Sequence, residues 1–432
     1  MKKIVLLFIL LAACTPTGDL ADYACPDCSI ILISIDTFRG DHLTCNGYDK
    51  YEVDITENIC KLASEGILFT NVISQAPSTQ AAHASILTSA IPSHHQSFNS
   101  RNTSYAKDYL PLPEILRREK YATAGFTGSG QMSAKYGFDR GFDVFAEFKN
   151  DTFRQIAEQG LEWLNETHGP VFLFLHTYEI HHPYTPDPAL LKEIEKNYTG
   201  TLGTNISVEL LKKINNKKHN ITQEDLQHII ATYDAEILSV DRTMKWFIEQ
   251  LKEIGRYNRT IIVITSDHGE EFGEHGQVGW HSHTLYNELL HVPLIIAAPG
   301  LKPGVSKKLA MSIDIAPTLL NMVRLKKPET FEGKSLAEGQ KYAISERDHG
   351  KPVPYAIQTT DVKYYWARHY QYLFNLTKDP GEQNNIFREQ QNLATALSTI
   401  YNDWVNQTTS NGTQVTVPPE LREQLEALGY VE

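Results

Sequence analysis

Short apolar runs recur along the chain and alternate with longer amphipathic segments. Uninterrupted apolar runs occupy residues 30–35, 171–176, 260–266 and 292–297. Runs of this kind predict strands that are buried on both faces of a sheet. The amphipathic segments 56–66 and 223–254 predict helices. Buried strands that alternate with helices predict an α/β fold built on a doubly wound, mostly parallel sheet.

Polar residues with metal-binding or catalytic chemistry stand where the predicted strands end. Asp36 follows the first apolar run, His176 closes the second, and Asp267 and His268 follow the third. Ligands of doubly wound sheets bind beyond the carboxyl ends of the strands. The pattern therefore predicts a functional site at this edge of the sheet.

The pattern changes after about residue 325. The segment LKKPETFEGKSLAEGQK is polar and interrupted by glycine and proline. It is followed by the strand-like runs YAISER, YAIQTT and YYWARHYQYLFNL and by a helical pattern near residues 388–404. We therefore predict a catalytic domain over residues 29–325 and a small C-terminal α+β subdomain over residues 326–432.

The N-terminus has the pattern of an export signal. Residues 1–13 contain two lysines, a short apolar run and small residues, and they precede Cys14. The run is too short for a spanning helix, and its end resembles a bacterial lipobox. We expect a signal peptide over residues 1–13, lipidation of Cys14 and a tether over residues 14–28, with a secretory signal cleaved elsewhere as the alternative. The lipobox predicts an exported envelope lipoprotein that faces the periplasm, attached through its lipid to the outer membrane.

The remaining cysteines fit an exported protein. Cys25, Cys28, Cys45 and Cys60 are even in number and could form two disulfides in an oxidising compartment. A structural disulfide is a better interpretation of the CxxC at residues 25–28 than redox or zinc chemistry, since no second CxxC accompanies it.

The net charge bears on the partner. The formal charge of −12 at pH 7 argues against nucleic acid. We expect no nucleic-acid partner.

The segment Asp267-His268-Gly269-Glu270 stands where a strand opens into a glycine-rich loop. Adjacent aspartate and histidine at a strand end can ligate one divalent metal, and Asp36 is a third candidate ligand. The tripeptide Asp-His-Gly alone is weak evidence for a metal site, and the presence of Asp36 at another strand end strengthens that evidence.

Longer motifs carry a family resemblance. They are ISIDTFRGDHLTCNGY, QAPSTQAAHASILTSAIPSHH, PVFLFLHTYEIHHPYTP, ITSDHGEEFGEHG and TLYNELLHVPLIIAAPG. In order and rough spacing they resemble sulfatase-like proteins of the alkaline phosphatase superfamily. The resemblance covers nearly the whole mature chain. It implies an alkaline phosphatase-like fold and a metal-dependent enzyme that acts on an anionic ester.

The nucleophile region departs from the sulfatase pattern. Sulfatases that use formylglycine carry Cys or Ser followed by x-Pro-x-Arg, whereas this chain has Thr79-Gln80-Ala81-Ala82-His83. A threonine cannot become formylglycine, so we expect none. The chain resembles instead the branch in which threonine is both nucleophile and metal ligand, as in lipoteichoic acid synthases and phosphoethanolamine transferases.

This resemblance implies a metal shell of Asp36, Thr79, Asp267 and His268. A divalent cation lowers the pKa of a hydroxyl, and a helix N-terminus stabilises an anion. A shell with imidazole favours Zn or Mn over Ca. Thr37 stands where sulfatases carry a second aspartate. Alternatively Thr79 only caps the helix, and Ser78 is a weaker candidate nucleophile.

Further residues are implied to bind substrate. His181 matches the family's Pro-His-x-Pro-Tyr motif, and His281 or His283 lies where the family places a lysine or histidine. His181 and His281 are expected to be catalytic, as general acids or as ligands of a second metal. Arg39, His83 and His283 are expected to bind substrate. Arg39 could equally be a structural ion-pair partner, and His182 and His283 could equally be ordinary loop residues.

A final departure bears on the substrate. Arylsulfatases carry a Gly-Lys-Trp-His run that holds the sulfate, and residues 125–130 (GFTGSG) lack both its lysine and its histidine. We therefore predict a phosphate ester or diester as substrate rather than a sulfate ester. The alternatives are a sulfuric ester hydrolase without formylglycine and a non-catalytic lipid-anchored binding protein.

Overall fold

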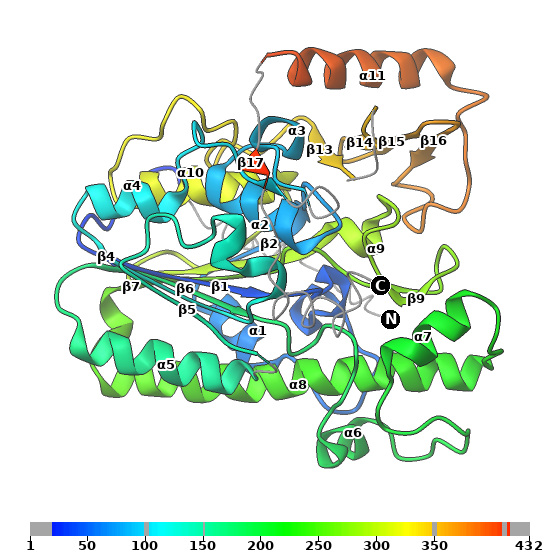
Figure 1. The fold of residues 1–432 in the computed structure, drawn as a ribbon, viewed down its shortest axis with the longest axis horizontal. Helices are drawn as coiled ribbons and strands as arrows, with labels where there is room; N and C mark the ends of the chain where they lie inside the picture. The colour runs from blue at the N-terminus through cyan, green and yellow to red at the C-terminus, as the bar shows by residue number, and fades with distance from the viewer. Residues whose placement is uncertain (1–19, 99–102, 150–151, 348–351, 408–412, 415–432) are drawn as a thin grey trace, which may run out of the picture.

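The computed structural model describes residues 20–98, 103–149, 152–347, 352–407 and 413–414. A central sheet lies between two helical layers (Figure 1). The helices are α1 Glu57–Ser64, α2 Thr79–Thr88, α3 Pro92–His95, α4 Leu112–Arg118, α5 Phe153–Glu166, α6 Pro188–Ile194, α7 Val208–Asn215, α8 Gln223–Glu253, α9 Asn287–Leu290, α10 Ile315–Met322 and α11 Gln391–Val405. Helices α5 and α8 cover one face of the sheet, and α2, α4 and α10 lie on the other.

The strands form one large sheet and smaller ones. They are β1 Ser29–Ile35, β2 Ile67–Ile73, β3 Thr103–Ser104, β4 Ala122–Thr127, β5 Val144–Glu147, β6 Val171–Thr177, β7 Thr260–Thr265, β8 Glu271–Phe272, β9 Val278–Trp280, β10 His291–Ala297, β11 Gly304–Ser306, β12 Ala310–Met311, β13 Ala343–Glu346, β14 Tyr355–Gln358, β15 Val362–Ala367, β16 Tyr370–Asn375 and β17 Thr413–Gln414.

The large sheet has nine strands in the order β11-β2-β10-β7-β1-β6-β4-β5, with β12 paired to β2. Strand β1 is parallel to both β6 and β7, and β4 is parallel to β5 and β6. Only β10 runs against its neighbours in this sheet, β2 and β7, among the described strands. The predicted doubly wound, mostly parallel sheet is confirmed.

Strand β1 explains how the core is divided. Ile31 and Ile33 belong to the hydrophobic cluster that includes residues of α5 and α8. Ile30 and Leu32 belong to the cluster that includes residues of α2 and α10. Successive side chains of a strand point to opposite faces, so an uninterrupted apolar run fills two cores at once.

The predicted elements of the first domain are confirmed. The apolar runs are β1, β6, β7 and β10, and the amphipathic segments are α1 and α8. Strand β2 was not predicted, because Thr70 and Asn71 interrupt its apolar run. Both residues are only half-buried, in contrast to their neighbours.

The C-terminal region forms the expected α+β subdomain. Strands β13 to β16 make an antiparallel sheet, and α11 packs against β14 and β15. Figure 1 shows α11 along the outer side of this sheet. Strand β17 pairs with β3, so the chain returns to the catalytic domain after α11. The numerical boundaries of the two units stay predictions.

The N-terminal predictions concern residues outside the described part. Signal peptide residues 1–13 and Cys14 lie there, so lipidation and envelope location stay predictions. None of the helices that the structure describes is long and apolar enough to cross a membrane. The four other cysteines form the disulfides Cys25–Cys28 and Cys45–Cys60.

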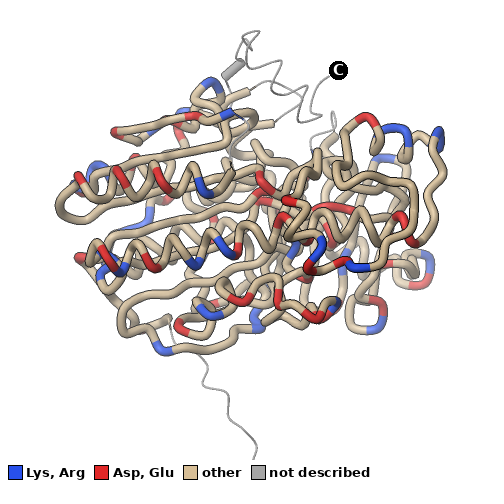
Figure 2. Tube along the Cα trace, turned by 90° about the horizontal axis from the view of Figure 1, so that it is seen from below, with Lys and Arg blue, Asp and Glu red and all other residues tan. Residues whose placement is uncertain are grey.

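Charged residues are distributed over the surface. Figure 2 shows Lys and Arg interspersed with Asp and Glu along the helices that face the viewer. An anionic substrate must therefore be held by local groups in its site rather than by the net field of the protein, which is negative.

Candidate active site

The strand register brings the first site together. Ser34 of β1 lies opposite Thr265 of β7 in parallel register. The residues that follow these strands, Asp36 and Asp267, therefore emerge side by side at the same edge. With His268 they form a buried group whose ligand atoms all lie within 4.8 Å of one another. This is the sheet edge at which the sequence predicted the site.

One oxygen of each of the two carboxylates has no hydrogen-bond partner among the described residues. Asp36 Oδ1 and Asp267 Oδ2 are buried and accept no hydrogen bond. Burial raises the pKa of Asp36 well above its usual range, and Asp267 raises it further. Burial also opposes ionisation of Asp267, but His268, His83 and His176 lower its pKa to about 2. Two buried carboxylate oxygens without hydrogen bonds, in one group with an imidazole, suit a divalent cation, so the residues present fit the predicted metal.

Thr79 joins this group from the start of α2. It is the first residue of α2 and fully buried, and its Oγ1 lies 3.4 Å from His268 Nε2. His268 Nδ1 donates to the carbonyl of Gly269 at 2.9 Å, which directs Nε2 towards Thr79 and the carboxylates. The structure thus brings the four predicted ligands Asp36, Thr79, Asp267 and His268 together.

His83 supports the start of α2, whereas the side chain of Ser78 does not. His83, one turn later, donates from Nδ1 to the Thr79 carbonyl at 2.9 Å, and its Nε2 accepts from Ser34 Oγ at 2.9 Å. Its Nδ1 is also 3.5 Å from Asp267 Oδ2. Ser78 precedes the helix, and its buried Oγ has no hydrogen-bond partner among the described residues. His83 therefore connects the backbone of Thr79 to Ser34 and Asp267.

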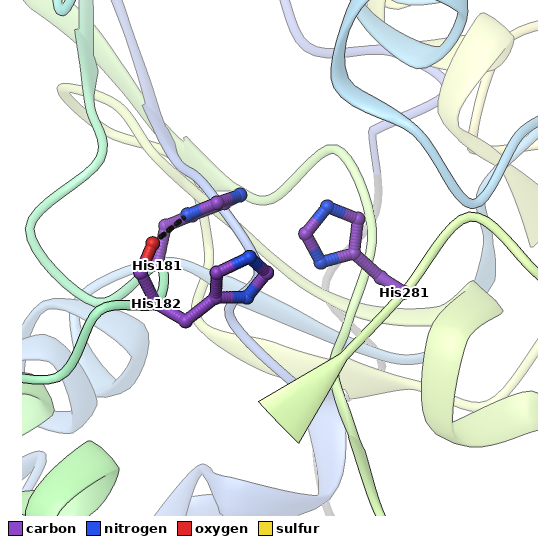
Figure 3. Close-up of side chains that lie close together, drawn as sticks. All are labelled: His181, His182 and His281. Carbon is purple, nitrogen blue, oxygen red and sulfur yellow. Dashed lines mark hydrogen bonds between the residues drawn. The ribbon is translucent and has the colours of Figure 1, made fainter. Parts of the chain in front are cut away.

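A second buried group lies beside the first. His181 and His182 follow β6, and His281 follows β9 (Figure 3). Their ligand nitrogens also lie within 4.8 Å of one another. The rings of His268 and His281 are 4.6 Å apart between centroids, so the two groups are contiguous.

Glu270 holds this second group in place. Its Oε1 accepts from His281 Nδ1 at 2.9 Å, and its Oε2 lies 3.3 Å from His182 Nδ1. Tyr184 donates to Oε2 at 3.1 Å. Burial alone would raise the pKa of Glu270, but His281 and His182 hold it well below its usual range. Burial lowers the pKa of His281 to about 4, so its neutral form prevails at neutral pH.

The other predicted substrate residues have protein partners. The Arg39 guanidinium contacts Asp41 at 2.8 Å and Glu274 at 2.6 Å and donates to the Glu270 carbonyl. His283 Nε2 lies 2.6 Å from Glu271 Oε2, outside the group formed by His181, His182 and His281. Substrate binding by Arg39, His83 and His283 stays a prediction.

Sequence reasoning left two site residues without a role. His176 Nε2 lies 3.3 Å from Asp36 Oδ2, and Glu270 connects His182 to His281. The position of His176 at the end of a buried strand could have indicated that it belongs to the site. Glu270 adjoins the predicted ligands in sequence, but only the approach of two other loops reveals its partners. Glu179, two residues before His181, accepts from Phe153 N at the start of α5.

The backbone is strained beside Asp36. Thr37 has φ +57°, in the left-handed region that non-glycine residues rarely adopt. Its N–H donates to Asp267 Oδ1 at 3.3 Å, and its hydroxyl donates to the Ile180 carbonyl at 3.2 Å. These bonds hold the strained turn, and such strain is concentrated at functional sites.

Comparison with known families identifies the chain. The Sulfatase family model matches residues 29–324. The chain belongs to the sulfatase family. A second model, N-sulphoglucosamine sulphohydrolase C-terminal, matches residues 273–402 of this sulfatase-family chain.

Curated relatives cover most of the chain at low identity. An arylsulfatase of Clostridium perfringens is 25% identical over 84% of this chain and 91% of its own length. An N-acetylglucosamine-6-O-sulfatase of Bacteroides thetaiotaomicron is 23% identical over 83% of this chain and 82% of its own length.

Solved structures show the same fold. One, determined with its substrate D-glucosamine-2-N,6-O-disulfate, has a TM-score of 0.73 at 20% identity and covers 88% of this chain and 99% of its own. The phosphonate monoester hydrolase of Agrobacterium radiobacter has a TM-score of 0.72 at 19% identity and covers 88% of this chain and 96% of its own. At these identities the likeness supports the alkaline phosphatase-like fold.

Proposed function

We propose that this chain is a metal-dependent hydrolase of phosphate esters in which Thr79 is the nucleophile. One observation carries the proposal. The Thr79 hydroxyl lies 3.4 Å from His268 Nε2, at the first position of α2 and beside two buried carboxylates that fit a cation. Family membership and the ester hydrolases among the similar proteins support the reaction class.

Asp36, Thr79, Asp267 and His268 would hold the cation, which supplies a lowered pKa for the hydroxyl and charge neutralisation at the ester. Zn or Mn suits a shell that mixes imidazole, carboxylate and hydroxyl. The N–H groups of the first turn of α2 add partial positive charge at the same point.

The reaction has two displacements. The oxygen of Thr79 attacks phosphorus, the bond to the leaving oxygen breaks, and the alcohol departs with the proton that the threonine lost. Water then attacks the phospho-threonine, releases phosphate and restores the hydroxyl. If an acceptor alcohol replaces water, the same residues perform a transfer.

Residues around the nucleophile have positioning roles in this scheme. His83 holds the Thr79 carbonyl, and His176 contacts Asp36. His181 and His281 lie on the substrate side as the second set of catalytic groups. Because burial holds the pKa of each below its usual value, a role as a ligand suits them better than that of a general acid at neutral pH.

The test compares hydroxyl variants of the purified protein. We expect Thr79→Ala to lose at least about 1,000-fold of activity on an aryl phosphate or phosphodiester, because no second group takes over the covalent step. Ser78→Ala, which removes the adjacent buried hydroxyl, is the matched control and keeps activity. Wild type assayed with chelator loses activity, and Zn or Mn restores it.

The outcomes separate the alternatives. Full activity of Thr79→Ala with loss in Ser78→Ala would transfer the role to Ser78. Preference for an aryl sulfate would establish the second candidate, a sulfuric ester hydrolase without formylglycine, which the sulfatase relatives favour. Absence of both activity and bound metal would support a binding protein. Quenched reactions provide a further check, because the adduct must lie on the peptide that contains Thr79.

A further inference from the structure

The loop after β4 contains a buried glutamine whose side chain has no protein partner. Gln131 is 3% exposed, and its Oε1 is buried without a hydrogen bond. Its Nε2 donates to no acceptor among the residues that the structure describes. Buried polar groups of folded proteins nearly always have a partner, so this amide is available to a ligand.

The topology of the sheet places Gln131 beside the first site. Strand β4 runs parallel to β6, so the loop that follows it emerges beside His176, near the end of β6. The N–H of Gly128 donates to His176 Nδ1 at 3.4 Å, and His176 Nε2 lies 3.3 Å from Asp36 Oδ2. The N–H of Gln131 donates to Tyr178 Oη at 3.1 Å, and the ring centroids of Tyr178 and His176 are 4.6 Å apart.

The conformation of this loop leaves Gln131 as its available polar side chain. Ser129 has φ +62°, in the left-handed region that non-glycine residues rarely adopt. The following residues, Gly130–Met132, form a 3₁₀ helix that packs against α2, the helix that begins with the nucleophile. The hydroxyls of Ser129 and Ser133 are occupied, because they donate to the two oxygens of Glu147 at 2.6 and 3.1 Å. The amide of Gln131 is not.

The charges around the site limit the charge of its ligand. Burial opposes ionisation of Asp267 and Glu270, but nearby histidines hold the pKa of both below the usual range, that of Asp267 at about 2. Both carboxylates are therefore negative at neutral pH. Burial lowers the pKa of His176 and of His181 well below the usual value, so these rings are neutral there.

Cationic side chains do not compensate for these carboxylates. The buried arginine and lysine side chains of the described residues are Arg39 and Lys363, and both are paired with carboxylates. Residues 125–130 lack the lysine and histidine that hold the sulfate in arylsulfatases, and Gln131 follows directly. Apart from the predicted cation, the contacts that this part of the site offers to an ester are neutral.

We propose that the amide of Gln131 donates a hydrogen bond to a non-bridging oxygen of the ester and makes the site selective for phosphodiesters over phosphate monoesters. A diester has one negative charge at neutral pH, whereas a monoester has nearly two. A glutamine amide supplies N–H donors without charge, which suits a singly charged ligand. The second charge of a monoester would lie uncompensated near Asp267 and Glu270. This selectivity rests on the proposed function.

A diester also suits the two displacements. The oxygen of Thr79 forms a bond to phosphorus, the bond to one alcohol breaks, and that alcohol takes the proton of the threonine. Water then forms a bond to phosphorus as the bond to Thr79 breaks; one of its protons restores the hydroxyl and the other passes to solvent. The product is a monoester with an additional charge that the site does not compensate, so its release is favoured.

Binding to a protein without the nucleophile tests the proposal. The full chain with Thr79→Ala is loaded with Zn and titrated calorimetrically at neutral pH with methyl phenyl phosphate, a diester, and with phenyl phosphate, a monoester. We expect the diester to bind at least about 10-fold more tightly. Gln131→Met in this background keeps the length of the side chain but removes its donors, so affinity for the diester should fall about 10- to 100-fold. Gln131→Lys adds a cation and should shift the preference at least about 10-fold towards the monoester.

Gln358 provides the matched control. It is also 3% exposed with an Oε1 that has no hydrogen-bond partner, but it lies in β14 of the C-terminal sheet. Gln358→Met should leave both affinities unchanged. Circular dichroism of each variant confirms that the fold is intact before titration. If Gln131→Lys does not fold, the comparison of Gln131→Met with Gln358→Met decides.

Equal affinities for the two esters in Thr79→Ala, or an unchanged affinity for the diester in Gln131→Met, would overturn the proposal. Absence of binding of either ester to the Zn-loaded protein would overturn it as well. Failure of the nucleophile proposal looks different. Thr79→Ala would then turn over the diester, while the preference for the diester and its loss in Gln131→Met would persist in kcat/KM.

Discussion

Without bound metal, the paired carboxylates of Asp36 and Asp267 lower the stability of the fold. Asp36 and Asp267 offer ligand oxygens within 4.8 Å of each other, and one oxygen of each accepts no hydrogen bond. Replacing Asp36 with asparagine keeps the shape and an oxygen for the His176 contact while it removes one charge. We predict that Asp36→Asn is more stable than wild type without metal and no longer gains stability from metal.

The magnitude follows from the separation. Two unit charges about 4.8 Å apart repel by about 3 to 4 kcal/mol at an effective dielectric constant of about 20. The wild type avoids part of this repulsion by protonating Asp36, whose pKa is raised by burial and by Asp267. The metal-free variant should therefore gain about 1 to 3 kcal/mol in its free energy of unfolding.

Addition of metal should make wild type more stable than Asp36→Asn. A ligand at about 100 times its dissociation constant adds about 2.7 kcal/mol to the stability of the protein that binds it. Urea unfolding in chelator and in Zn or Mn measures both effects on the same preparations. The urea midpoint of wild type should rise strongly on addition of metal, and that of Asp36→Asn should rise much less, since the variant has lost a metal ligand.

Asp234 provides the matched control. It is a fully buried aspartate whose oxygens lie 2.6 Å from His42 Nδ1, 2.6 Å from Tyr48 Oη and 2.7 Å from Tyr51 Oη. Because these partners favour its ionised form, Asp234→Asn should lose about 1 to 3 kcal/mol with or without metal. If Asp36→Asn lost stability in chelator as Asp234→Asn does, the reasoning about uncompensated carboxylates would be refuted.

Two further predictions concern the stability of the fold away from the site. Burial lowers the pKa of His95 to about 3, below its ordinary value near 6.5, so its contribution to stability is complete above pH 6.5 and is lost as the pH falls towards 3. In urea titrations the free energy of unfolding of wild type should therefore fall by about 2 kcal/mol more than that of His95→Gln between about pH 7.5 and about pH 5. An equal fall in both proteins would contradict this. Lys363 is fully buried, and its ammonium lies 2.9 Å from the carboxylate of Glu382. Lys363→Met should therefore lower the free energy of unfolding by about 3 to 5 kcal/mol, because that carboxylate loses its cation, whereas Lys363→Met combined with Glu382→Leu should recover much of the loss in thermal melts. A further, additive loss in the double variant would contradict the pairing.

The sequence alone determined the frame of this protein. Apolar runs long enough to be buried on both faces specified β1, β6, β7 and β10, since only a sheet covered by helices on both sides hides them. Because parallel strands present their carboxyl ends at one edge, Asp36, Asp267 and His268 could be predicted to share a site. Thr79 could be added only through the family resemblance, as its hydroxyl is indistinguishable from a helix cap in sequence.

Tertiary structure decided how the second group is built. By its sequence His182 could equally be a site residue or an ordinary loop residue, and it joins His181 and His281 because two loops meet over Glu270. His283, two residues from His281, instead pairs with Glu271. Local patterns carry the period of a strand or helix, but they do not encode which loops approach each other. That choice depends on packing between segments about 100 residues apart in the chain, so only the folded structure reveals which histidines share a site.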